Sequence, residues 1–240
     1  MTITTAKQVI TLHYAPDNAS LVVRLLLEEL GVAYETKLVD RSCNAQKSVQ
    51  YLALNPDGLI PVCIINGAPV FETAAILLSL ADMHERFSVH VDDALRPQFL
   101  KWLFFISNSV HSDLRQRFYP EKFVGDDEHA QRSFNRVTLQ RLCGRFAALD
   151  AAYKNSDHNY LFGPEPTIIE LYLAVCFRWA QLYPVATSAD FEPHIFPAIV
   201  KMVEQLEQRC SIRVSCQKEG ISGCFFSRPD FANPPEGVAL

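Results

Sequence analysis

Apolar positions are spaced in two different ways along the chain. In the first 86 residues, short runs rich in β-branched and aromatic residues alternate with runs in which apolar residues recur every three or four positions. These patterns predict strands over 9–14, 34–39, 59–65 and 68–71, and helices over 21–30 and 73–84. Gly31 is the expected C-cap of the first helix, and Asn66 with Gly67 predicts a tight hairpin turn. The opening β-α-β order implies parallel pairing through a right-handed crossover.

From residue 97 onward the spacing is helical, without a convincing strand. It predicts helices over 95–118, 127–154, 167–184 and 194–208. Residues 40–52 carry a mixed signal that suits a loop and a short helix. We therefore expect an α/β domain of order βαβ-α-ββα over residues 1–86, an all-helical domain over 95–221 and an irregular, proline-rich tail over 222–240.

Composition and charge exclude some classes of function. The 240 residues are 49% apolar and 20% charged, which is typical of a globular protein. With 22 basic and 27 acidic residues the net charge is −5, so nucleic-acid binding is not expected. Charged residues interrupt every apolar stretch before it reaches the ~18 residues that cross a bilayer. The first ten residues lack the apolar core of a signal peptide, and we expect a cytoplasmic protein without a membrane partner.

The seven cysteines are irregularly spaced and form no C-x-x-C pair. Neither a zinc site nor a dithiol redox centre is therefore indicated, and we expect no metal. The predicted state is a set of reduced, structural thiols. No glycine-rich nucleotide-binding loop is present in the sequence.

Several segments together resemble the cytosolic glutathione transferases. Three are NPDGLIPV over residues 55–62, FETAAI over 71–76 and GPEPTIIE over 163–170. Two more, WLFFISNSVH over 102–111 and CFRWA over 176–180, are similar to the bacterial beta class. The resemblance extends over about residues 8–218. It implies a thioredoxin-like domain that binds glutathione, followed by a helical-bundle domain.

The resemblance also implies where glutathione would bind. Ile60 and Pro61, a proline that is cis in the family, would hold the cysteinyl backbone of glutathione, while Glu72 and Thr73 would hold its γ-glutamyl end. A helix start supplies free N–H groups and roughly half a positive charge, which suits such a carboxylate. Ordinary helix capping is the alternative for Glu72 and Thr73.

The start of the first helix departs from the beta class. Ala19 stands where that class has a cysteine that forms a mixed disulfide with glutathione, so covalent thiol chemistry is excluded at this position. Noncovalent activation of the glutathione thiol remains, with Ser20 and Asn18 as the candidate catalytic residues. One hydrogen bond to a thiolate contributes ~1.5–3 kcal/mol, or roughly one to two pKa units. For both residues, N-capping is the structural alternative.

In the helical domain, His111 matches a histidine that lines the beta-class site, and we expect it to contact glutathione. Phe104 and Ser112 replace polar residues of that class. Arg178, together with the tryptophan that follows it, either completes the site or packs the core. Thr167 begins a capping box, for which a structural role is expected.

These observations favour a glutathione transferase-like enzyme. It would bind glutathione noncovalently as co-substrate, use the thiolate on a small-molecule electrophile or peroxide in detoxification, and, by the resemblance, form a homodimer. A catalytically silent binding or scaffold protein is the alternative, which Ala19, Phe104 and Ser112 support. A family member adapted to isomerisation or reductive dehalogenation is a third hypothesis, and Ala19 argues against it.

Overall fold

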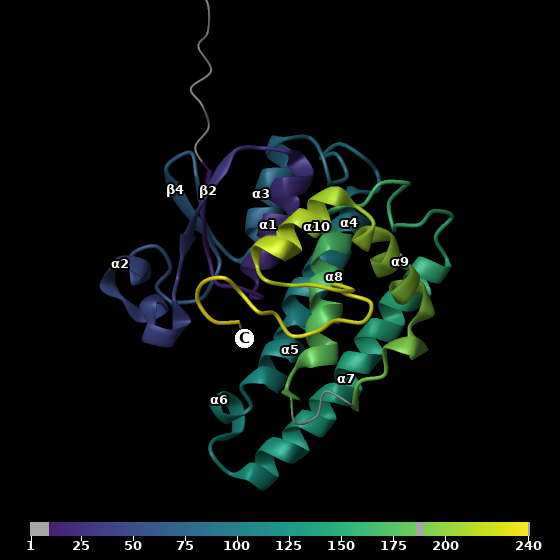
Figure 1. The fold of residues 1–240 in the computed structure, drawn as a ribbon. Coiled ribbons are helices and arrows are strands. Elements are labelled where there is room, and N and C mark those ends of the chain that lie inside the picture. The colour runs from purple at the N-terminus through teal and green to yellow at the C-terminus, as the bar shows by residue number, and fades with distance from the viewer. Residues whose placement is uncertain (1–9, 186–189, 240) are drawn as a thin grey trace, which may run out of the picture. The chain divides into compact units, whose positions relative to one another are not determined.

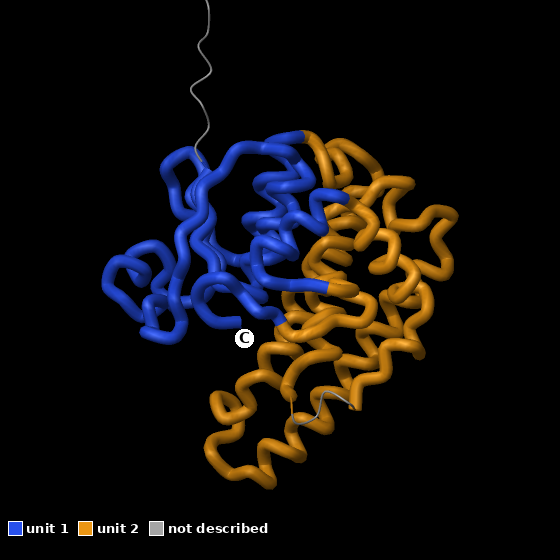
Figure 2. The backbone as a smooth tube through the Cα atoms, viewed as in Figure 1, with its two compact units in different colours: residues 1–84, 210–222, 232–240 blue, residues 85–209, 223–231 orange. Residues whose placement is uncertain are grey.

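The computed structural model describes residues 10–185 and 190–239. The backbone divides into two compact units (Figure 2). The first unit comprises residues 1–84, 210–222 and 232–240, and the second comprises 85–209 and 223–231. The units differ from the expected domains because a helix and a tail segment from the end of the chain pack with the N-terminal part.

The first unit is built on a four-stranded mixed sheet of order β2-β1-β3-β4. The strands are β1 (Ile10–Tyr14), β2 (Tyr34–Leu38), β3 (Val62–Ile65) and β4 (Ala68–Phe71). As predicted, β1 and β2 are parallel and β3 and β4 form a hairpin. The third strand begins at Val62 rather than Leu59, since Pro61 has no N–H to donate to a ladder.

Helices α1 (Ser20–Leu30) and α3 (Thr73–Met83) follow β1 and β4, and the short α2 (Val49–Leu52) lies between β2 and β3. Short 3₁₀ turns, Arg41–Cys43 and Ala45–Lys47, precede α2. All residues of α1 except Glu28 are buried, in keeping with its run of leucines and valines. Gly31 ends α1 in the left-handed conformation with a φ of 69°, so the predicted C-cap is confirmed.

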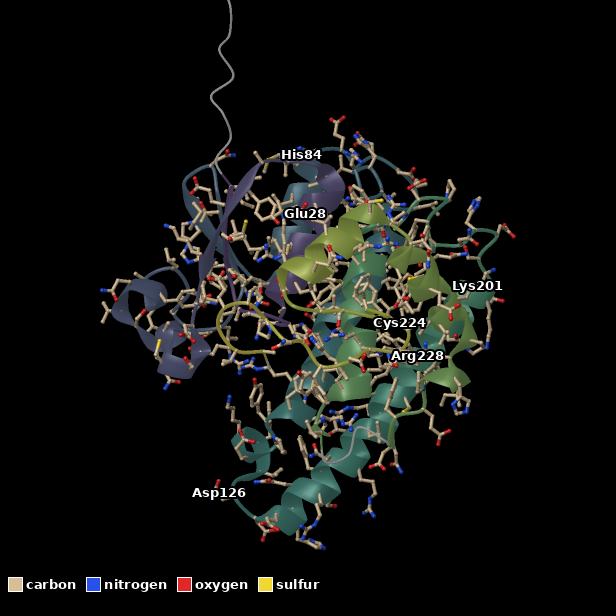
Figure 3. The ribbon with its side chains drawn as sticks, in the orientation of Figure 1. Glu28, His84, Asp126, Lys201, Cys224 and Arg228 are labelled. Atoms are coloured by element: carbon tan, nitrogen blue, oxygen red, sulfur yellow. The ribbon has the colours of Figure 1, made fainter. Side chains whose placement is uncertain are left out.

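Helix α10 (Cys210–Lys218) packs on α1 within the first unit (Figure 1). Its sequence is mostly polar, and the apolar spacing gave no signal for it. Side chains join it to α1 at both ends: Ser211 donates a hydrogen bond to Glu29, and Lys218 pairs with Glu28, which is labelled in Figure 3. These polar contacts, together with the buried side chains of Ile212 and Cys216, hold α10 in the first unit.

The second unit is helical, as predicted. It contains α4 (Arg96–Phe105), α5 (Ser112–Phe118), α6 (Glu121–Val124), α7 (Glu128–Lys154), α8 (Ile168–Leu182) and α9 (Pro197–Glu207). A π-helical segment, Ile106–His111, joins α4 to α5, and a 3₁₀ turn, Pro193–Ile195, precedes α9. Every residue of α8 except Gln181 is buried, so α8 forms the core around which this unit packs.

The predicted capping box opens α8. Glu170 is fully buried and accepts hydrogen bonds from the backbone N–H and the hydroxyl of Thr167, both at 2.7 Å. It also accepts from the Tyr153 hydroxyl and the Leu161 N–H at 3.0 Å. One carboxylate thus satisfies donors from α7, from the loop before α8 and from the cap of α8.

The tail after α10 is irregular, as expected, and is divided between the units. Arg178 is fully buried and donates to the backbone carbonyls of Phe225 and Asp230 at 2.9 and 2.8 Å, which holds the first tail segment in the second unit. In the first unit, the Asn233 N–H donates to the Gly220 carbonyl at 2.8 Å. These contacts support the packing role for Arg178.

All seven cysteines are free thiols, with Cys63, Cys176 and Cys216 buried. Within residues 10–185 and 190–239, no helix combines the length and the apolar character needed to cross a membrane. The same residues contain no cluster of three or more His, Cys, Asp or Glu side chains suited to a metal ion.

Replacing Glu170 by alanine is expected to lower the free energy of unfolding by about 3 kcal/mol, because several buried donors lose their acceptor. Thr167→Ala removes only the cap and is expected to cost about 1 kcal/mol. Urea unfolding of both variants measures the difference, and equal losses would contradict this account of the capping box.

Candidate functional site

The pairing of the strands brings several chain segments to one edge of the sheet. Val62 pairs with His13 of β1 on one side and with Phe71 of β4 on the other. Beyond this row β4 ends and β3 has not yet begun, whereas β1 continues for one more residue, Tyr14, which pairs with Leu38 of β2. The loop to α1 follows β1, the Ile60–Pro61 peptide bond precedes β3, and α3 begins directly after β4. The N-termini of α1 and α3 therefore begin at the same edge, where their N–H groups can face a common ligand.

The loop from β1 to α1 is buried and tightly held. Asp17 is fully buried with a φ of 47°, a left-handed conformation that is uncommon for a residue with a side chain. Helix α1 has Ala19 at its N-cap and receives no side-chain capping bond. The capping alternative for Asn18 and Ser20 is therefore wrong.

Ser20 and Asn18 have different surroundings. The Ser20 side chain is fully buried, and its hydroxyl donates to the Ala15 carbonyl at 2.9 Å and accepts from the Ala15 N–H at 3.2 Å. Asn18 is partly exposed, and its Oδ1 accepts from the Ala19 N–H at 2.7 Å. Its Nδ2 donates no hydrogen bond within the part of the chain that the structure describes. Ser20 braces the loop, while Asn18 has an amide donor available for a ligand.

The predicted cis peptide bond is present between Ile60 and Pro61. The residue before Ile60 is fixed by two donors, because the Tyr51 hydroxyl and the Asn55 amide both donate to the Leu59 carbonyl, at 2.8 and 2.9 Å. Gly58, with a φ of 63°, is required in this turn, since a Cβ there would lie 2.7 Å from the Gln46 carbonyl oxygen. The ladder of β3 begins only at Val62, so the backbone of Ile60 lies outside the paired sheet.

Glu72 is the N-terminal flanking residue of α3. Its φ is 70° and its ψ is 112°, an unfavourable backbone conformation for any residue but glycine, and its side chain is exposed. It makes no capping bond to α3, so the helix-capping alternative is wrong for Glu72. Thr73 is buried in the first turn. The backbone thus turns sharply where α3 begins and leaves the Glu72 side chain exposed.

His111 lies in the second unit, at the end of the π-helical segment. Its Nδ1 is 2.6 Å from the Tyr172 hydroxyl oxygen, and its ring packs against Trp179 with centroids 5.4 Å apart. Burial, with a smaller effect of the Arg115 cation, lowers the pKa of His111 to about 4. The imidazole is therefore neutral near pH 7. It can exchange a neutral hydrogen bond with a ligand but cannot supply a positive charge.

Among the described residues, neither the start of α1 nor β3 provides an accessible thiol. Ala19 has no reactive group, and Cys63 of β3 is buried, which raises the pKa of its thiol to about 12. A second hydroxyl near the start of α1 is also occupied, because Tyr14 donates to Glu236 of the tail. The arrangement suits a ligand that brings its own peptide-like backbone, carboxylate and reactive atom.

Two carboxylates near the start of α1 could not be predicted from the sequence. Glu236 contacts Tyr14, and Glu219, one residue after α10, contacts Asp17 and Arg24. Both come from the last tenth of the chain, and no spacing rule links them to residues so distant in sequence. Only packing could show them.

Comparisons with known proteins show which families this chain is similar to. Residues 7–82 match the family described as glutathione S-transferase, N-terminal domain. A glutathione S-transferase from Xanthomonas campestris pv. campestris is 25% identical over 215 residues, which cover 88% of this chain and 99% of that protein. A maleylacetoacetate isomerase from Rhizobium meliloti is 26% identical over 238 residues, which cover 95% of this chain and 100% of that protein.

A solved structure gives the same result for the fold. A glutathione transferase homologue from Sulfitobacter, with bound glutathione, has a TM-score of 0.75 at 18% identity and covers 88% of this chain and 98% of its own. Residues 7–82 are therefore similar to the N-terminal domain of glutathione S-transferases, and the relative from Xanthomonas extends the similarity over most of the chain. The matches confirm the predicted thioredoxin-like α/β domain followed by a helical domain.

Replacing Ser20 by alanine is expected to lower the free energy of unfolding by about 1–3 kcal/mol, because the Ala15 N–H and carbonyl lose a buried partner. Ser79→Ala, at an exposed position of α3, is the matched control and is expected to change stability little. Thermal or urea unfolding measures the free energy of unfolding of both variants. Equal values would contradict the proposed role of Ser20 in stabilising the loop.

Acidification is expected to destabilise the protein partly through His111. Its pKa is lowered on folding, so the unfolded chain binds more protons between about pH 6.5 and pH 4, and stability falls as pH drops through this range. The loss from this residue reaches at most about 3 kcal/mol. Stability curves of His111→Gln should flatten there, and those of the exposed control His158→Gln should not. Parallel curves for wild type and His111→Gln would contradict the assignment.

Proposed function

We propose that this protein binds reduced glutathione noncovalently at the sheet edge of its first unit and uses the thiolate as a nucleophile on an electrophilic or peroxide substrate. The convergence of three features carries the proposal: the free backbone of Ile60 before cis-Pro61, the turned backbone of Glu72 at α3, and the available amide of Asn18 at α1. The family similarity supports the same ligand.

Each contact has a physical basis. An extended tripeptide can pair its cysteinyl backbone with Ile60, as an added strand does at a sheet edge. The α-carboxylate of its γ-glutamyl residue would face the N–H groups at the start of α3, beside Thr73, and its ammonium group would face the Glu72 carboxylate.

Asn18 is the proposed thiolate donor. The thiol of glutathione, like that of free cysteine, ionises near pH ~8.5. A charge-assisted hydrogen bond from the Asn18 amide would stabilise the thiolate by ~1.5–3 kcal/mol and lower the thiol pKa by roughly one to two units. Such a shift would make a large fraction of bound glutathione nucleophilic at neutral pH. Ser20 is a weaker candidate because its hydroxyl proton is already donated to Ala15.

The remaining parts of the proposal concern partners and surroundings. We propose an apolar small-molecule electrophile as second substrate, a homodimer and a cytoplasmic role in detoxification, all from the family resemblance. His111 contributes, in this proposal, as a neutral hydrogen-bonding group.

A silent binding protein is the second candidate function. Ala19 favours it, because this position supplies neither a thiol nor a hydroxyl at the helix start. Such a protein would bind glutathione without turnover, so binding and conjugation must be measured separately.

Calorimetric titration of the purified protein with reduced glutathione is expected to give a dissociation constant below ~1 mM. Asn18→Ala is expected to raise this constant about tenfold, and to lower kcat/KM with an aryl halide by a similar factor. Asn18→Asp retains the oxygen that binds the Ala19 N–H but lacks the amide donor, so it should be at least as impaired.

The outcomes separate the two candidates. No heat at millimolar glutathione would overturn the binding site itself. Binding without any conjugation or peroxidase turnover would favour the silent protein, and turnover that Asn18→Ala abolishes would exclude it.

A further inference from the structure

A buried carboxylate lies behind the proposed thiolate donor. Glu219 is fully buried, and its two oxygens have different partners: Oε1 accepts from Arg24 Nε at 2.7 Å, and Oε2 accepts from the Asp17 backbone N–H at 2.8 Å. One carboxylate therefore ties helix α1, through Arg24, to the loop that precedes it.

The bond to Asp17 is made where the loop needs support. Asp17 is held in the left-handed region, which is sterically disfavoured for a residue with a Cβ, and it directly precedes Asn18. No side chain caps α1 from within the loop. A fixed acceptor on the Asp17 N–H therefore stabilises the turn that sets the direction of the Asn18 side chain.

The other half of the carboxylate is fixed as well. The Arg24 guanidinium is buried, lies 4.5 Å from the centroid of the Tyr14 ring and donates to the Tyr34 hydroxyl. Burial raises the pKa of Glu219 to about 7, although Arg24 and the Asp17 N–H both favour the charged form. An ionised carboxylate at this depth is costly unless both partners stay in place, which makes the position of Asp17 well defined.

We propose that Glu219 is a positioning residue for the glutathione thiolate: by holding the Asp17 N–H, it aims the Asn18 amide at the sulfur. The inference rests on the proposed function and extends it, because a residue that follows the last helix then controls the reactive end of the ligand. It acts through Asn18, so its effect must depend on Asn18.

A double-mutant cycle with Asn18→Ala and Glu219→Gln tests this dependence, with reduced glutathione as the titrant in calorimetry. Glu219→Gln is expected to raise the dissociation constant about five- to tenfold in the native background and by less than about twofold in the Asn18→Ala background. S-methylglutathione cannot form a thiolate, so wild type and Glu219→Gln should bind it equally well.

Ser211→Ala is the matched control. It removes another hydrogen bond between α10 and α1, from Ser211 to Glu29 at 2.6 Å, without touching the loop. It is expected to leave both dissociation constants unchanged. If Glu219→Gln does not fold, Glu219→Asp replaces it in the same double-mutant cycle. This variant keeps the negative charge beside Arg24, but its shorter side chain cannot reach the Asp17 N–H as well.

The inference and the proposed function fail in different ways. A wild-type protein that binds no glutathione overturns the proposed function and the inference together. If the wild-type protein binds glutathione and Glu219→Gln does not change the dissociation constant, only the inference is overturned. The inference is also overturned if Glu219→Gln weakens glutathione binding equally in the native and Asn18→Ala backgrounds, or if it weakens the binding of S-methylglutathione to the same degree. Either result would mean that the role of Glu219 is structural.

Discussion

The register of the sheet is the constraint on which the rest of this structure depends. Because Val62 is paired with both His13 and Phe71, the ends of β1 and β4 and the start of β3 must lie at one edge. A slip of one residue on β3 would also turn Val62 and Cys63, both fully buried, toward the opposite faces of the sheet. Packing of the core therefore fixes which backbone groups meet at the edge.

The chemistry of this edge follows from which polar groups are already in use. The hydroxyls of Tyr14 and Ser20 are committed to Glu236 and Ala15, and Ala19 offers nothing. The Asn18 amide and the N–H groups at the start of α3 suit stabilisation of an anion. In the proposed function, the reactive sulfur therefore comes from glutathione.

The predictable part of the site is local in sequence. The run from Asn55 to Pro61 and the step from Glu72 to Thr73 are short motifs whose geometry is set by neighbouring residues, such as the left-handed Gly58. Their positions could be predicted for that reason. The choice between Asn18 and Ser20 could not, because it depends on whether a hydroxyl is buried against the backbone of Ala15.

The sequence by itself determined the strands, most of the helices, the capping box at Thr167 and the absence of a thiol at position 19, because each follows from residue type and short-range spacing. Only the tertiary structure decided that Glu219 and Glu236 belong to the first unit and meet the loop after β1. Their partners are about two hundred residues away, and such contacts arise from how whole elements pack, which no local pattern encodes.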